Sequence, residues 1–301
     1  MKKIEFIIIN LLVTLFSLLP KQGGRYLGIF MGKLWFAFDK KHRIIALHNL
    51  SKVYSPKFSP RKIKKIAKNN FIFHAITFFE IIRLKRLSNK QILNEIDSVE
   101  GLDNYFSAKK KGKPVFMMSA HFGNWELMAA AAPLIIKHPI YLIARKLDSN
   151  ALGKITNQIR EKTGNKVIDK KQSATRVRQI IKEKQTIGIL PDQKAMINVS
   201  VEAPFLGYMA KTNRGLALFD LRYKPEIVPI FSYRLKNGKY KLKIFPPLKR
   251  PKRTDFKKDI KIYTTIYNDF ISREIYKNPE HWFWFHDRWK EKEALFSKKN
   301  K

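Results

Sequence analysis

The chain has 301 residues and carries 61 Lys and Arg against 24 Asp and Glu, so its formal charge is +37. This charge excludes an acidic or neutral protein and predicts attraction to a polyanion, whether nucleic acid, anionic lipid or an acidic protein. The sequence contains no cysteine, which excludes disulfides, thiolate metal sites and a cysteine nucleophile. Apolar residues make up 45% of the chain, enough for a large globular core.

The most apolar stretch lies at the N-terminus, where residues 4–19 follow two lysines and contain one carboxylate, Glu5. As a helix this stretch would rise about 24 Å, slightly less than the roughly 30 Å hydrocarbon core of a bilayer. Pro20 and the pair Gly23 and Gly24 then predict a helix break. Because no small-residue cleavage pattern follows, we expect an uncleaved segment rather than a signal peptide.

A second apolar segment, residues 26–38, is too short to span a bilayer and suits an element that lies at the interface. We therefore expect residues 1–38 to form a membrane anchor with an interfacial segment, and residues 39–301 to form the main domain. The alternative, that both segments are ordinary core helices, stays open. An approximate apolar stripe over residues 61–87 predicts a core helix, with contact to lipid or an acyl chain as the second possibility.

From residue 113 onward, short apolar runs alternate with helical segments. Strands are predicted at 115–119, 140–144, 166–168 and 186–190, and helices at 125–136, 149–163, 174–183, 213–222 and 255–276. Alternating βα units predict an α/β fold with a mostly parallel sheet flanked by helices. Residues 226–234 and 240–245 flank Asn237 and Gly238, a hairpin signal that predicts a mixed sheet.

Candidate chemistry follows the first of these strands, in the sequence SAHFGNWE over residues 119–126. His121 and Glu126 are five residues apart and would point about 140° away from each other on an ideal helix. Gly123 and Asn124 predict a turn between them, through which the Glu126 carboxylate is expected to reach a His121 ring nitrogen. Such a pair would orient the imidazole and leave its other nitrogen free to act as a general base. A structural histidine is the alternative.

Several segments in order resemble the bacterial lipid A biosynthesis (lauroyl/myristoyl) acyltransferase family. This family is related to the glycerol-phosphate acyltransferases, which have an aspartate where this branch has the glutamate of H-x4-E. The matching segments are the N-terminal apolar stretch, SAHFGNWE at 119–126, YLIARKLDSN at 141–150, GILPDQ at 188–193, PFLGYMAKTNRG at 204–215, VPIFSYR at 228–234 and PEHWFWFHDRWK at 279–290.

The resemblance implies a glycerol-phosphate-acyltransferase-like fold and acyl transfer from an acyl carrier protein thioester to a hydroxyl of a Kdo-bearing lipid A precursor. It implies an enzyme at the cytoplasmic face of the inner membrane, with His121 as base and Glu126 as its orienting group. No metal or cofactor is expected, because a thioester is already activated toward a deprotonated hydroxyl. The charge fits an acidic carrier protein, a phosphorylated acceptor and an anionic membrane surface.

Five further residues match the family pattern. Arg145 is expected to bind an acceptor phosphate or to stabilise the oxyanion. Asp192 and Gln193 are expected to shape the site, and Phe205 to line an acyl channel. Arg178 matches an arginine in the helix before residues 186–190. After this helix the family commonly has a glycine, whereas this sequence has Lys184 or its neighbour at that position.

Some matching positions are interpreted as architectural. Thr212 is expected to cap the helix that carries Gly215. The tryptophans at 282–289 suit either a bilayer interface or closure of the core, and His281 and His286 lack the spacing of a metal site.

Two alternative functions remain. One is an acyltransferase of the same superfamily that acts on a lysophospholipid, glycerol phosphate, an ornithine lipid or a glycolipid. The other is a membrane-tethered protein that binds a polyanion through its lysines. Nucleic acid is not the expected partner, because we find neither a binding module nor basic residues interleaved with aromatics on one face.

Overall fold

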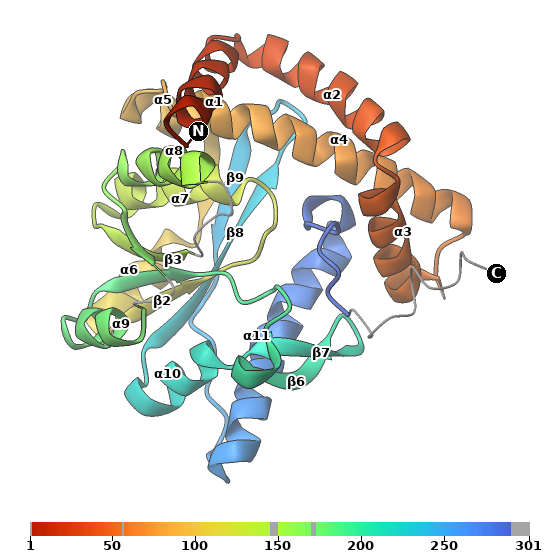
Figure 1. The fold of residues 1–301 in the computed structure, drawn as a ribbon. Coiled ribbons are helices and arrows are strands. Elements are labelled where there is room, and N and C mark those ends of the chain that lie inside the picture. The colour runs from red at the N-terminus through yellow and green to blue at the C-terminus, as the bar shows by residue number, and fades with distance from the viewer. Residues whose placement is uncertain (1, 56, 145–149, 170–172, 290–301) are drawn as a thin grey trace.

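The computed structural model describes residues 2–55, 57–144, 150–169 and 173–289. Its centre is a seven-stranded sheet in the order β1-β9-β8-β2-β5-β3-β4, and β6 and β7 form a separate antiparallel pair (Figure 1). The strands are β1 (Ile96–Glu100), β2 (Val115–Met118), β3 (Ile140–Ala144), β4 (Lys166–Asp169), β5 (Thr186–Ile189), β6 (Ser200–Phe205), β7 (Tyr208–Asn213), β8 (Glu226–Arg234) and β9 (Tyr240–Ile244). Strands β8, β2, β5, β3 and β4 are parallel, whereas β9 pairs antiparallel with β8 and parallel with β1. The predicted α/β class and mixed, mostly parallel sheet are thereby confirmed.

Helices surround this sheet. They are α1 (Lys2–Ser17), α2 (Lys21–Phe38), α3 (Lys40–Tyr54), α4 (Pro60–Leu84), α5 (Asn89–Asn94), α6 (Leu102–Lys110), α7 (Trp125–Ile136), α8 (Asn150–Glu161), α9 (Ser173–Lys182), α10 (Gly215–Tyr223) and α11 (Phe256–Lys277). Phe116 and Met118 on β2 join a core cluster with α9, α10 and α11, whereas Val115 and Met117 join a second cluster with α5 to α8. This alternation along β2 divides the core into two layers, one on each face of the sheet.

The predicted βα rhythm of the chain is confirmed, since strands or helices lie at each of the expected positions between residues 115 and 276. The elements that were not anticipated are α3, α5, β1, α6 and the β6–β7 hairpin. Thr212 does not cap the helix that follows it. It lies in β7, where its hydroxyl oxygen accepts hydrogen bonds from Asn268 and Arg288, and the residue that precedes α10 is Arg214.

The N-terminal helices α1 and α2 form a bent pair, with an angle of 116° between them. The break falls at residues 18–20, but Gly23 and Gly24 lie inside α2, contrary to the prediction that they would break the helix. Gly24, Gly28 and Gly32 are four residues apart and share the face that packs on α4. A Cβ on Gly28 would lie 2.7 Å from the Ile76 Cα, so these glycines allow close contact between the two helices.

Among the described residues, no single helix has the length and apolar composition to cross a membrane, and only the bent pair α1–α2 meets such a test. The predicted anchor helix over residues 4–19 corresponds to α1, which also has 16 residues but begins and ends two positions earlier and is followed by a sharp corner. Membrane attachment through residues 1–38 remains a prediction.

Candidate active site

The strands β2 and β5 are hydrogen-bonded neighbours, and their carboxyl ends carry His121 and Asp192. The Ser119 backbone N–H donates to the Ile189 carbonyl at 3.0 Å, which continues the pairing just beyond the two strands. Open α/β sheets place their sites at the carboxyl ends of parallel strands. The sheet order thus joins two residues that lie 71 positions apart in the chain.

His121 and Asp192 form the polar centre of this edge. The His121 Nδ1 and Asp192 Oδ1 are 2.9 Å apart, and the His121 backbone N–H donates to Oδ2 at 3.0 Å. Trp282 Nε1 donates to the same Oδ2 at 2.8 Å. The Asp192 side chain is 1% exposed and the His121 side chain 23% exposed, so the carboxylate is enclosed while the imidazole retains access to solvent.

Asp192 is held in its charged form. Burial by itself would raise the pKa of Asp192, but the attraction of a charged His121 and the three hydrogen bonds from His121 and Trp282 lower it to about 2. An ionised carboxylate accepts but does not donate. The His121 Nδ1 therefore carries the proton in this pair, and Nε2 of the neutral ring offers a lone pair, which is the arrangement of a general base.

The prediction that Glu126 contacts His121 is wrong: Glu126 pairs with Arg160, and His121 pairs with Asp192. The Glu126 carboxylate is buried and accepts two hydrogen bonds from Arg160 on α8, from Nε at 2.9 Å and from Nη2 at 2.5 Å. Helix α7 begins at Trp125, and Asn124 caps it by accepting from the Leu127 N–H. Glu126 therefore belongs to the first turn of the helix and bonds to α8, whereas His121 lies before this helix and bonds to Asp192, three residues after the end of β5.

The turn between His121 and α7 is fixed by a distant part of the chain. Gly123 has a φ of +63°, and a Cβ there would collide with the Ser232 carbonyl oxygen. The Gly123 N–H donates to the His281 carbonyl at 2.9 Å, and the Phe283 N–H donates to the His121 carbonyl at 3.0 Å. The aromatic segment near the C-terminus thus pairs with the turn like a short strand, which sequence spacing did not indicate.

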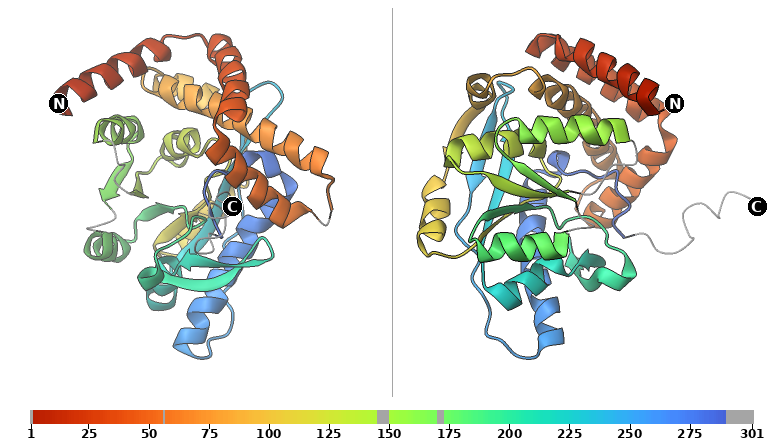
Figure 2. Two further views of the ribbon diagram at one scale, coloured as in Figure 1. Left: turned by 45° about the vertical axis from the view of Figure 1, so that its right-hand side comes forward. Right: turned by 60° about the vertical axis from the view of Figure 1, so that its left-hand side comes forward.

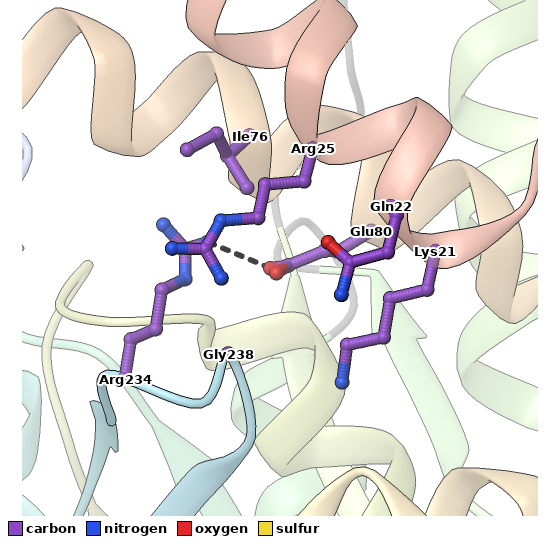
Figure 3. Close-up of a pocket in the computed structure, with 7 residues that line it drawn as sticks. All are labelled: Lys21, Gln22, Arg25, Ile76, Glu80, Arg234 and Gly238. Carbon is purple, nitrogen blue, oxygen red and sulfur yellow. Dashed lines mark hydrogen bonds and ion pairs between the residues drawn. The ribbon is translucent and has the colours of Figure 1, made fainter.

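A partly buried ionic network supports the other side of this turn. Asn124 Nδ2 donates to Glu80 Oε2 at 3.0 Å, and the same oxygen accepts from Arg234 Nη2 at 2.7 Å and from the Tyr240 hydroxyl at 2.6 Å. Glu80 and Arg234 also line a small cavity of about 10 Å³ together with Arg25, where Figure 3 shows the Glu80–Arg234 ion pair. The cavity has room for about one water molecule, and Glu80 supports the turn through its hydrogen bond from Asn124.

An apolar cleft of about 380 Å³ adjoins the imidazole. Its lining residues come from α2, α4, the start of α7 and the C-terminal segment: Met31, Trp35, His74, Ala75, Thr77, Phe78, Phe79, Ile81, Trp125 and Phe283. The rings of Trp125 and Phe283 lie 5.2 Å and 6.5 Å from the His121 ring, measured between centroids. The volume falls in the range of small-molecule sites, and the walls suit a hydrocarbon chain.

Two further histidines near the cleft are buried and neutral. Burial, together with the positive charge of Arg234, lowers the pKa of His74 and of His281 to about 3. His74 Nε2 lies 3.2 Å from the Trp282 carbonyl oxygen. These rings support the aromatic packing around the site, and His121 alone among the three is paired with a carboxylate in the described part of the chain.

The remaining predicted residues lie in different environments. Gln193 is half-buried beside Asp192, and Arg178 is exposed on α9, where it donates to the Thr175 hydroxyl at 3.3 Å. Phe205 is completely buried in the core, with its ring 5.4 Å from that of Trp282, and it does not line the cleft. Arg145 lies outside the described residues. Across those residues, no group of three or more His, Asp or Glu side chains is arranged to hold a metal ion.

The chain resembles a known family over nearly its whole length. Residues 2–291 match the model of a family described as bacterial lipid A biosynthesis acyltransferase. The chain is 23% identical over 267 residues to a lipid A biosynthesis palmitoleoyltransferase of Escherichia coli strain K12, which covers 88% of this chain and 84% of the relative. A lipid A biosynthesis acyltransferase of Shigella flexneri matches with the same identity and coverage.

The fold and the site define an α/β protein with a carboxylate-oriented histidine beside a hydrocarbon cleft. The chain belongs to the bacterial lipid A biosynthesis acyltransferase family, because the family model covers nearly its whole length. It is therefore an acyltransferase of lipid A biosynthesis.

Proposed function

We propose that this enzyme transfers a fatty acyl chain from an acyl carrier protein thioester to a hydroxyl of a Kdo-bearing lipid A precursor. The observation that carries the proposal is the position of His121. Its Nδ1 is held by the ionised Asp192, and its ring adjoins an apolar cleft through Trp125 and Phe283.

In the proposed reaction, Nε2 of His121 takes the proton of the acceptor hydroxyl as the hydroxyl oxygen attacks the thioester carbonyl carbon. Asp192 stabilises the resulting imidazolium, as an enclosed carboxylate does for a neighbouring cation. When the tetrahedral intermediate collapses, the carbon–sulfur bond breaks and the imidazolium returns its proton to the departing thiolate. The products are an ester and a free thiol, so proton and electron pairs balance.

Glu126 has a different role in this proposal from the one expected of it. Its two hydrogen bonds from Arg160 tie the first turn of α7 to α8, next to the turn that carries His121. We assign Glu126 to positioning α7 and assign the orientation of His121 to Asp192. Arg145, Arg178 and Gln193 are proposed to bind the polar part of the acceptor.

The formal charge of +37 supports both proposed substrates, because the carrier protein is acidic and the acceptor bears phosphates and carboxylates. It also supports attachment to an anionic leaflet. We infer that the enzyme works at the cytoplasmic face of the inner membrane and that residues 1–38 attach it there.

The test is a mass spectrum of lipid A from a Gram-negative host that lacks its own secondary acyltransferase. The host receives the wild-type gene, His121→Ala or His48→Ala. His48 is exposed on α3, so its variant controls for the loss of a histidine. A mass gain of one acyl chain is expected with the wild type and with His48→Ala. With His121→Ala we expect the rate of acyl transfer to fall by about 10² to 10⁴, so that this mass gain is lost.

The other outcomes have definite meanings, provided that expression is verified. If lipid A is unchanged but another lipid gains an acyl chain, the acceptor is wrong and the transfer chemistry stands. If His121→Ala acylates lipid A as fast as the wild type, His121 is not the base.

A further inference from the structure

The helix α1 is apolar on both of its faces. Its inner face packs on the domain, where the Phe16 ring lies 5.8 Å from that of Phe79 and Lys85 Nζ donates to Asn10 Oδ1 at 2.8 Å. Its outer face is exposed at Ile4, Ile7, Ile8, Leu11, Leu12 and Leu15, with exposed fractions between 47% and 66%. A helix facing water on its outer side would carry polar residues there.

This exposed apolar surface continues around the corner onto α2. Of the 23 exposed large apolar side chains among the described residues, 11 lie between residues 4 and 38. Those on α2 are Tyr26, Phe30, Met31 and Phe38. Both helices lie at one end of the molecule, opposite the start of α11, in every view (Figures 1 and 2). We name the exposed apolar residues of positions 4–38, together with Phe78 on α4, the apolar end.

Within α1 and α2 the charged residues are basic apart from Glu5, and one of the basic residues, Lys21, is paired with Glu95. Residues 2–38 contain five basic residues and this single carboxylate. The basic residues include Arg25, whose guanidinium lines the small cavity of Figure 3, and Lys33, which is exposed. An apolar helix face flanked by cations is complementary to an anionic leaflet, with hydrocarbon below and phosphates at its edge.

The apolar end and the cleft share two residues. Met31 and Phe78 are 43% and 55% exposed, and both also line the cleft. Trp125 and Phe283 line it too and have ring contacts with His121. The cleft therefore reaches from the exposed apolar surface to the two rings that pack against His121.

We propose that α1 and α2 lie within an anionic leaflet rather than across the bilayer, and that the cleft opens between Met31 and Phe78 into the hydrocarbon. A lipid chain would then reach His121 without leaving the membrane. The docking of the two helices is independent of the reaction, whereas the use of the cleft rests on the proposed function.

Orientation can be measured directly because the chain has no cysteine. Lys3→Cys and Phe256→Cys place single thiols at the start of α1 and at the start of α11. Both variants, inserted into phosphatidylglycerol-containing vesicles, are exposed to a maleimide that cannot cross the bilayer. In-plane helices predict that both thiols are modified from the same side. Modification from opposite sides would mean that α1 spans the bilayer and would overturn the proposal.

Docking can be measured by vesicle sedimentation. The double variant Leu11→Glu and Leu15→Glu changes only exposed side chains, and we expect at least about tenfold weaker binding to phosphatidylglycerol-containing vesicles. The matched control changes Phe256 and Ile262 on α11 to Glu, also at exposed positions, and should bind like the wild type. Equal binding by both double variants would contradict the proposal. The proposal would also be contradicted if the Leu11 and Leu15 changes abolished self-association of the protein but left its binding to vesicles intact. The apolar end would then bind a second copy of the chain.

Lateral entry is tested with lipids brominated near the chain end, which quench tryptophan fluorescence on contact. Trp125 lines the cleft and its ring packs against that of His121, so Trp125→Phe should remove part of the quenching seen with the wild type. Equal fractional quenching in both proteins would overturn lateral entry. A protein that passes all three tests but transfers no acyl chain would overturn the proposed function and leave the docking intact.

Discussion

The turn that carries His121 and the cleft beside it are built in opposite ways. Directional hydrogen bonds hold the turn: the carboxylates of Asp192 and Glu80 accept from it, and the backbone of residues 281–283 pairs with it. Apolar surfaces form the cleft, and its α2–α4 wall depends on glycines that allow close approach. The difference follows from their tasks, because proton transfer needs one fixed geometry, whereas a flexible hydrocarbon chain needs volume without polar groups.

The largest effect on acyl transfer is expected from a change in the turn, Asp192→Asn, which removes the charge that faces the imidazolium. Acyl transfer should fall about 10²-fold or more, since the base loses both its orientation and its electrostatic support. The measurement is the rate with a purified acyl carrier protein thioester. A variant with wild-type activity would show that Asp192 does not orient the base.

The same substitution also tests acid stability. The folded pKa of about 2 lies below the unfolded value of about 3.9, so the ionised group stabilises the fold above pH 4. That contribution, of order 2 kcal/mol, is lost as the pH falls from about 4 through 2. Denaturant unfolding at pH 7 and at pH 3 measures this contribution. The free energy of unfolding should differ less between the two pH values in the variant than in the wild type.

The cleft can be narrowed without touching the polar network. Ala75 lines the cleft and is 8% exposed, so Ala75→Phe would occupy part of its volume. We expect transfer of a long acyl chain to fall by about tenfold or more, because the chain must compete with the new ring. Vesicle binding should be unchanged, which checks that the variant is folded, and an unchanged rate would show that the cleft holds no substrate chain.

A pair of glycine substitutions tests the wall between α2 and α4. Gly28→Ala places a methyl group 2.7 Å from the Ile76 Cα and should destabilise the protein by about 1–3 kcal/mol. Gly23→Ala has no contact closer than 3.6 Å and should stabilise α2 by roughly 0.5–1 kcal/mol. Thermal unfolding of both variants measures these changes, and equal shifts would show that the glycine contact does not determine the packing.

The smallest effect is expected from Trp282→Phe, which removes one of three hydrogen-bond donors to Asp192. With one donor fewer, the carboxylate stabilises the imidazolium more strongly, because less of its charge is neutralised. The acid limb of the pH–rate profile should move to higher pH, by about one unit or less. A uniform loss of rate at every pH would instead indicate that Trp282 only packs the core.

Much of this architecture can be predicted locally. The alternation of apolar and helical segments predicts strands β2 to β5, and Asn237 with Gly238 predicts the β8–β9 hairpin, because both signals depend on neighbouring residues. The position of His121 after a buried strand likewise identifies it as a candidate base. The strand β1 was missed because its alternation is weak and because it pairs with a distant strand, β9, with Ile96 opposite Tyr240.

The sequence by itself therefore determines the class of fold, the family and the residue types available for the chemistry. Only the tertiary structure decides which of two carboxylates faces His121. Spacing favours Glu126, five residues away, but the order of strands places Asp192 beside the imidazole and α8 places Arg160 beside Glu126. The same holds for Trp282 and for the cleft, since contacts between distant segments depend on how the elements pack.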